Sequence, residues 1–139
     1  MRMVAAAVLA VMAATPASAQ GRSGIAFAEA PEASAGVCFG GSPDAALACA
    51  RERCVAGAEG LQPSDCLRVQ WCFPARWSGD VFLQVADGPH WHEYLCGWDS
   101  RAAVEAAATV ACDRSRRTDL IECALVRLWD EDGREYPAD

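Results

Sequence analysis

The chain has 139 residues, of which 12 are basic and 19 acidic, and its formal net charge at pH 7 is −7. An acidic chain without a cluster of basic residues is a poor ligand for DNA, for RNA and for anionic membrane surfaces, so we expect none of these partners. Its length is enough for one domain with a single core and too short for two independent ones.

Residues 1–19 are typical of a secretory signal peptide. Arg2 gives the segment a positive start, and the apolar run 4–14 is long enough for a signal core but too short to span a bilayer. The segment 16–19 supplies a cleavage site, so we expect the mature chain to begin at Gln20, with 11 arginines, 19 acidic residues and a net charge of −8. No later apolar run reaches the length of a membrane anchor. We therefore expect a bacterial protein that is secreted or periplasmic and is not inserted in a membrane.

The mature chain repeats itself with an offset of 58 residues. The offset, with one residue deleted in its last part, superposes four pairs of positions: Cys38 on Cys96, Cys54 on Cys112, Cys66 on Cys123 and Val69 on Val126. An internal repeat of this length indicates tandem copies of one structural unit. We expect a single domain over 20–129 that consists of two repeats, at about 24–72 and 81–129.

In the first copy, short apolar runs at 25–29 and 37–39 predict two strands separated by a turn. Ser42 is typical of a helix N-cap, and a helix is expected over 43–56, because Pro43 suits the first helical position and Gly57 follows the last. The stretch 66–72 predicts a further strand, with alternate residues on one face: Leu67, Val69 and Trp71.

The second copy predicts strands at 81–85, 90–96 and 121–129, with a helix capped by Ser100 between the last two. Residues 130–139 are rich in acidic residues and predict a solvated tail. We expect the α+β class: strand-strand-helix-strand occurs twice, and about six strands form one mainly antiparallel sheet covered by two helices on one face.

All eight cysteines lie in the mature chain, so export predicts up to four disulfides. The repeat predicts the pairs Cys54–Cys66 and Cys112–Cys123, because duplication should produce the same bond twice. The other four cysteines allow three pairings. Among these, the equivalent positions Cys38 and Cys96 suggest one bond, and the two cysteines without a counterpart in the second copy suggest Cys49–Cys72.

The repeated pattern of a capping serine, an alanine-rich helix that ends in cysteine, a loop and a Cys-x-x-Val strand resembles domain-of-unknown-function family 4189. The residues that carry the resemblance are Gly40, Ser42, Ala45, Cys54, Cys66 and Val69, with Ser100, Ala103, Cys112, Cys123 and Val126 in the second copy. The resemblance extends over about residues 24–129. It implies export and a disulfide-bonded repeat, and it implies no catalytic residues, because the family has no established activity.

The stretch His90-Trp91-His92-Glu93 holds the residues best suited to a metal. On a strand, His90 and His92 point to the same side and could share a zinc or copper ion, with Glu93 as a further group and Asp87 or Asp99 as a third ligand. This pattern predicts a metal-binding protein or a metal-assisted hydrolase. The alternative is that both histidines simply lie on a half-exposed strand.

Three tryptophans, Trp77, Trp91 and Trp98, fall in predicted loops or beside turns. Tryptophan is enriched where proteins bind partners, so these side chains are candidates for a binding face; alternatively, they cover a small alanine-rich core. Our leading hypothesis is a non-enzymatic, inhibitor-like interaction module without a cofactor, whose partner is another exported or cell-envelope protein. The metal-assisted hydrolase is the second hypothesis.

Overall fold

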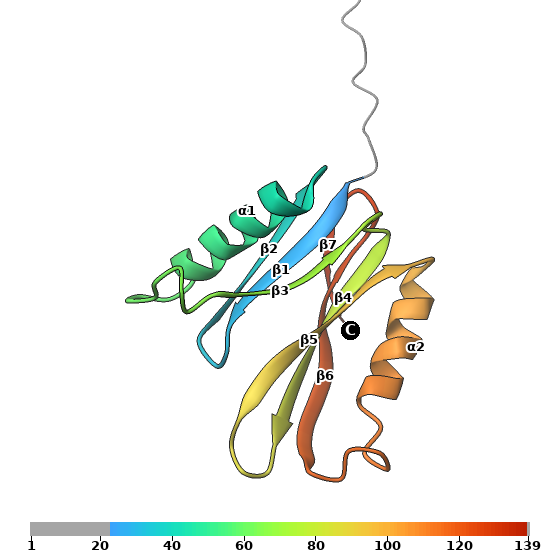
Figure 1. Cartoon of the computed structure of the whole chain (residues 1–139). Coiled ribbons are helices and arrows are strands. Elements are labelled where there is room, and N and C mark those ends of the chain that lie inside the picture. Colours follow the sequence, from blue (N-terminus) through green and yellow to red (C-terminus); the bar gives the residue numbers. More distant parts are fainter. Residues whose placement is uncertain (1–22, 139) are drawn as a thin grey trace, which may run out of the picture.

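The computed structural model describes residues 23–138, and the predicted signal peptide, residues 1–19, lies outside this part of the chain. In chain order the elements are β1 (Gly24–Ala30), β2 (Ser34–Gly40), α1 (Pro43–Ala56), β3 (Leu67–Cys72), β4 (Trp77–Val85), β5 (His90–Trp98), α2 (Arg101–Ala111), β6 (Leu120–Trp129) and β7 (Glu135–Pro137) (Figure 1). The predicted α+β class is confirmed.

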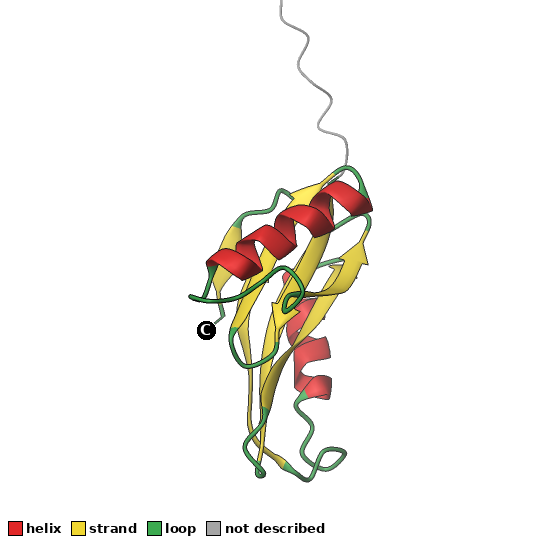
Figure 2. Cartoon of the chain, turned by 60° about the vertical axis from the view of Figure 1, so that its left-hand side comes forward, coloured by secondary structure: helices red, strands yellow, loops and turns green. Residues whose placement is uncertain are grey.

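The strands form two antiparallel sheets, with the orders β2-β1-β3 and β5-β4-β6-β7. The expected single sheet with both helices on one face is wrong. Each helix instead covers its own sheet, because α1 packs on β1 and β2 whereas α2 packs on β4, β5 and β6. Figures 1 and 2 show the two helices on opposite outer sides with the strands between them.

Both helices begin at the serines that the sequence indicates. The Ser42 hydroxyl accepts a hydrogen bond from the Ala45 N–H at 3.5 Å, and the Ser100 hydroxyl accepts one from the Ala103 N–H at 3.2 Å. Gly57 caps the C-terminal end of α1. These caps satisfy N–H and C=O groups that a helix cannot pair internally, and so they fix where each helix starts and ends.

The two sheets pack through an aromatic core. Phe27 of β1 stacks on Tyr94 of β5 with ring centroids 4.3 Å apart, and Trp129 of β6 meets the same phenyl ring edge-on at 5.9 Å. Ile25 and Val37 complete the buried cluster from the first sheet. Burial of this apolar surface from water joins the two sheets.

The structure contains four disulfides: Cys38–Cys49, Cys54–Cys66, Cys72–Cys96 and Cys112–Cys123. The two pairs predicted from the repeat, Cys54–Cys66 and Cys112–Cys123, are therefore confirmed.

The other two suggested bonds, Cys38–Cys96 and Cys49–Cys72, are wrong. Cys38 and Cys49 meet beneath α1, on the outer face of the first sheet. Cys72 and Cys96 lie beside the core between the sheets. A sheet separates the two locations, so a bond between them is excluded.

A bulge interrupts the pairing of β3 with β1. Gln70 pairs with Phe27 and Arg68 with Ala28, which leaves Val69 without a partner. The expected common face of Leu67, Val69 and Trp71 is therefore wrong. The extra residue moves the side chains that come before it in the strand to the opposite face of the sheet. In β6, Val126 is left over in the same way between Leu125 and Arg127.

Within the segment expected to be a solvated tail, Glu135–Pro137 form β7 and pair with the end of β6, with Glu135 and Pro137 exposed. The Trp129 indole N–H donates to the Glu135 carboxylate at 3.1 Å, and the Tyr136 hydroxyl donates to Asp130 at 2.8 Å. These bonds offset the acidic composition that otherwise favours a solvated segment.

Candidate functional site

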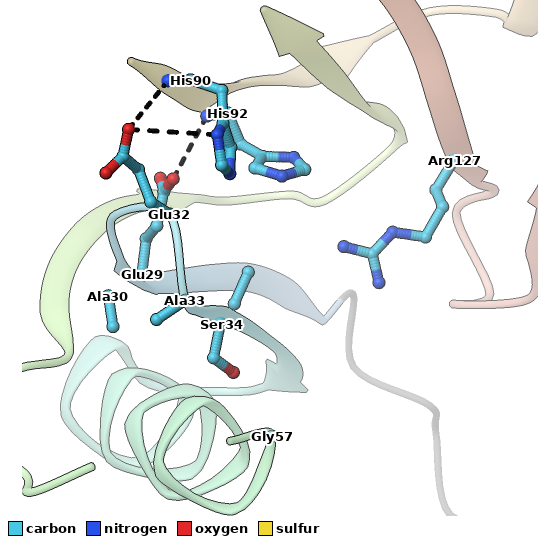
Figure 3. Close-up of a pocket in the computed structure, with 10 residues that line it drawn as sticks. Glu29, Ala30, Glu32, Ala33, Ser34, Gly57, His90, His92 and Arg127 are labelled. Carbon is cyan, nitrogen blue, oxygen red and sulfur yellow. Dashed lines mark hydrogen bonds and ion pairs between the residues drawn. The ribbon is translucent and has the colours of Figure 1, made fainter. Parts of the chain in front are cut away.

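A pocket of about 350 Å³ opens where the β1–β2 turn meets the second sheet. Its walls carry two carboxylates, two imidazoles and one guanidinium, together with small residues of the turn and the end of α1. The charged and imidazole side chains are Glu29, Glu32, His90, His92 and Arg127. Figure 3 shows Arg127 across the pocket from Glu32 and the two histidines.

The turn between β1 and β2 positions Glu32. The Ala33 N–H donates to the Ala30 carbonyl at 3.0 Å, and Glu32 has a φ of 62°. That backbone conformation normally favours glycine. It aims the Glu32 carboxylate at β5, where Oε1 accepts a hydrogen bond from the His90 backbone N–H at 3.2 Å.

Glu29 makes the matching contact from β1 itself. Its Oε1 accepts from the backbone N–H of His92 at 3.1 Å, although Glu29 is only 7% exposed. β5 is an edge strand of its sheet, and edge strands present unpaired N–H groups. Glu29 and Glu32 therefore satisfy backbone groups that would otherwise be open to another strand.

Behind the pocket wall lies Asp80 of β4, whose side chain is fully buried. One of its oxygens is 2.6 Å from Nδ1 of His92, and the other accepts from Nε and Nη2 of Arg127 at 3.1 and 2.7 Å. The register brings these groups together, because Asp80 is directly opposite Arg127 and is two residues before Phe82, the partner of His92. A buried carboxylate needs such compensation.

Burial and neighbouring charges shift the pKa values of this cluster. Desolvation raises the pKa of Glu29 above its usual value, against the opposing effect of the His92 N–H. The hydrogen bond to Asp80 raises the pKa of His92. Burial raises the pKa of Tyr94 above its usual value.

The expected metal ligands do not converge. His90 and His92 share a side of β5 as predicted, but Glu93 is on the opposite side and accepts from Arg117 at 2.7 and 3.2 Å. Asp99 forms an ion pair with Arg76. Within residues 23–138, no three histidine, cysteine, aspartate or glutamate side chains are arranged to hold a metal ion.

The three candidate tryptophans do not form one face. Trp77 is opposite Trp98 in the β4–β5 register, and Trp77 stacks on Tyr136 at 5.8 Å. Trp91 is opposite Leu83, roughly 20 Å further along the strands at about 3.3 Å per residue, and packs against the core beneath α2. Trp98 is 39% exposed, whereas Trp91 packs against the core. The alternative that these tryptophans cover the core therefore fits Trp91 best.

His90 and His92 are predicted from the sequence, whereas Glu29, Glu32, Asp80 and Arg127 are not. Asp80 alone carried a usable signal, as a charged residue directly before the apolar run 81–83. Contacts between residues 58 to 63 positions apart, such as Glu32 with His90 and Glu29 with His92, depend on how the two sheets pack.

Comparison of the chain with family models, with curated proteins and with solved structures finds no match in any of the three. The resemblance to domain-of-unknown-function family 4189 stays a prediction. Over residues 23–138, neither helix is long and apolar enough to cross a membrane.

Proposed function

We propose that this protein is an exported, non-enzymatic interaction module of the inhibitor-like kind, which binds another exported or envelope protein. The observation that carries the proposal is that His92 and Arg127, two reactive side chains of the pocket wall, are both held by the buried Asp80. Such a pocket is suited to binding rather than to bond breaking.

The His92–Asp80 pair deserves comparison with hydrolases, in which a carboxylate orients a histidine that activates a hydroxyl. The hydroxyl that lines this pocket belongs to Ser34, and it donates to the Cys54 carbonyl at 2.7 Å. The second oxygen of Asp80 holds Arg127. These contacts favour a structural role for the pair, because no hydroxyl of the lining is directed toward His92 by a hydrogen bond.

Four disulfides support export, since such bonds persist in oxidising compartments. Duplication of one unit is part of the proposal. It is supported by the element order β-β-α-β, which occurs twice, and by the central place of β1 and of β4 between their two neighbouring strands.

The experiment is affinity capture from the exported fraction of the source bacterium, with the oxidised mature chain immobilised. We expect one protein to be retained, to be identified by mass spectrometry and, once purified, to bind at one-to-one stoichiometry in solution. The same preparation should show no hydrolase activity on peptide, ester and glycoside substrates. Turnover of any of these substrates that Asp80→Asn abolishes would remove the proposal.

A further inference from the structure

We propose that the pocket between the β1–β2 turn and β5 binds a cationic side chain, an arginine guanidinium or a lysine ammonium, presented by the protein partner. This inference rests on the proposed function and adds the chemistry of the partner. Its foundation is the arrangement of Glu29 and Glu32 on one wall of the pocket.

The charge of the pocket is negative once internal pairs are accounted for. Arg127 is compensated by Asp80 through two hydrogen bonds of 2.7 and 3.1 Å. Glu29 and Glu32 accept hydrogen bonds from the backbone N–H groups of His92 and His90, and the Glu32 carboxylate also lies 3.9 Å from Nδ1 of His90. Among the described residues, neither carboxylate forms an ion pair with an arginine, and a guanidinium or ammonium in the pocket would supply a countercharge.

Glu29 makes this a built site rather than a surface cluster of acids. It is 7% exposed and faces a pocket whose other walls include the alanines of the turn. Burial of a carboxylate without a countercharge costs free energy, which a bound guanidinium recovers through charge-assisted hydrogen bonds. Among the described residues, the second oxygen of Glu32 has no hydrogen-bond partner, so it is available to a ligand.

The size of the pocket fits one long side chain. Its volume of about 350 Å³ is at the lower end of the roughly 300–1,000 Å³ of small-molecule sites. The protein as a whole has a net charge of −7, which attracts a basic partner over a distance and orients it before contact. The local and the global charge therefore favour the same class of ligand.

The test is an NMR titration of the ¹⁵N-labelled, oxidised mature chain with a capped Gly-Arg-Gly peptide. Its neutral counterpart contains citrulline, which has nearly the shape of arginine without the charge. We expect the arginine peptide to shift the backbone amides of His90 and His92 saturably, and a lysine peptide to do so more weakly. The citrulline peptide should bind roughly tenfold more weakly or not at all, because it lacks the charge-assisted bonds.

Two variants carry the same charge change at different places. Glu32→Gln should weaken the arginine peptide by about threefold, since Glu32 is half exposed and its charge is partly screened by solvent. Glu59→Gln, in the exposed loop after α1, should leave the affinity unchanged.

The inference is wrong if the His90 and His92 amides do not move up to about 20 mM arginine peptide, well above the weak end of specific affinities. It is equally wrong if citrulline binds as well as arginine, or if Glu32→Gln and Glu59→Gln have equal effects. A partner that is captured despite these outcomes would leave the interaction module standing and remove only the cation site.

Discussion

At the residue scale, Asp80 is the group on which the cluster between the sheets depends. Its carboxylate is fully buried and is compensated by Arg127 and His92. Removing one partner of a buried pair leaves the other charge uncompensated, which costs more than the pair itself contributes.

We predict that Arg127→Met lowers the free energy of unfolding by roughly 2 kcal/mol, less than for a fully buried pair because about a third of Arg127 is exposed. The matched control, Arg116→Met, removes an exposed arginine and should change the free energy of unfolding by less than about 0.5 kcal/mol. Urea unfolding with the disulfides intact measures both values. Equal stabilities of the two variants would show that Asp80 does not need Arg127.

The pH dependence of stability follows from His92 and Glu29, both of which have a raised pKa in the folded chain. For each group, the stability contribution is fully present below the unfolded pKa and is lost as pH rises through the folded pKa. The unfolded values are 6.5 for His92 and 4.5 for Glu29. Stability should therefore fall as the pH rises above these values.

We predict a lower urea midpoint at about pH 8.5 than at about pH 5.5, and a smaller difference in His92→Gln, which cannot titrate. A wild-type midpoint that rises over this interval, or a His92→Gln variant with an unchanged difference, would contradict this assignment.

The residues of the pocket were only partly predictable. Alternation along a strand was enough to put His90 and His92 on one side and to make that side polar. The same rule puts Glu93 on the other side of the strand, which contradicts its expected place beside the two histidines. Glu29 and Glu32 escaped prediction because their contacts run to backbone N–H groups of a distant strand.

At the element scale, the close approach of α1 to β2 depends on Gly36. A Cβ at this position would lie 1.9 Å from the Ala50 carbonyl oxygen of α1. The buried residues of the helix at this contact are small, Ala46 and Ala50, which allows the short distance.

We therefore predict that Gly36→Ala lowers the free energy of unfolding by about 1–3 kcal/mol, since the helix must shift to relieve the overlap. Gly41→Ala is the control, because a Cβ there meets nothing within 4 Å. Thermal unfolding of both variants measures the difference. If Gly36→Ala is as stable as Gly41→Ala, the packing of α1 on β2 is looser than described.

The helices were predictable because their caps are local. Ser42, Ser100 and Gly57 lie within a few residues of the groups that they satisfy.

The division into two sheets was not predictable, because alternation tells which residues share a face but not which strands share a sheet. The positions of the bulges, Val69 and Val126, were not predictable for a related reason, since an extra residue in a strand leaves no mark in its composition. The strand β7 was missed because it has only 3 residues and depends on its pairing with β6.

At the scale of the whole molecule, Cys72–Cys96 is the disulfide that joins the two sheets, whereas the other three lie within one half of the chain. It links β3 to β5 across a separation of 24 residues. By restricting the unfolded chain, such a bond contributes about 3 kcal/mol.

We predict that replacing Cys72 and Cys96 together by serine lowers stability by about 3 kcal/mol and broadens or shifts the amide signals of His90 and His92. Replacing Cys112 and Cys123 should leave these two amide signals in place, because that bond lies at the far end of α2. Denaturant unfolding and ¹⁵N spectra provide the measurements. Unchanged His90 and His92 signals without Cys72–Cys96 would mean that the aromatic core alone fixes the sheets.

Of the whole molecule, the sequence predicted the α+β class and two of the four disulfides. The repeat was informative where both copies carry the same cysteine, as at Cys54 and Cys112. It was misleading at Cys38 and Cys96, which are equivalent in sequence but bond to Cys49 and Cys72, two cysteines of the first copy that have no counterpart in the second.

The most direct measurement is the dissociation constant of the captured partner for the wild-type chain, for Glu32→Gln and for Glu59→Gln at one ionic strength. Our account predicts weaker binding to Glu32→Gln, by about threefold, and wild-type affinity for Glu59→Gln. Equal affinities of all three chains would contradict it, because the partner would then bind elsewhere on the molecule.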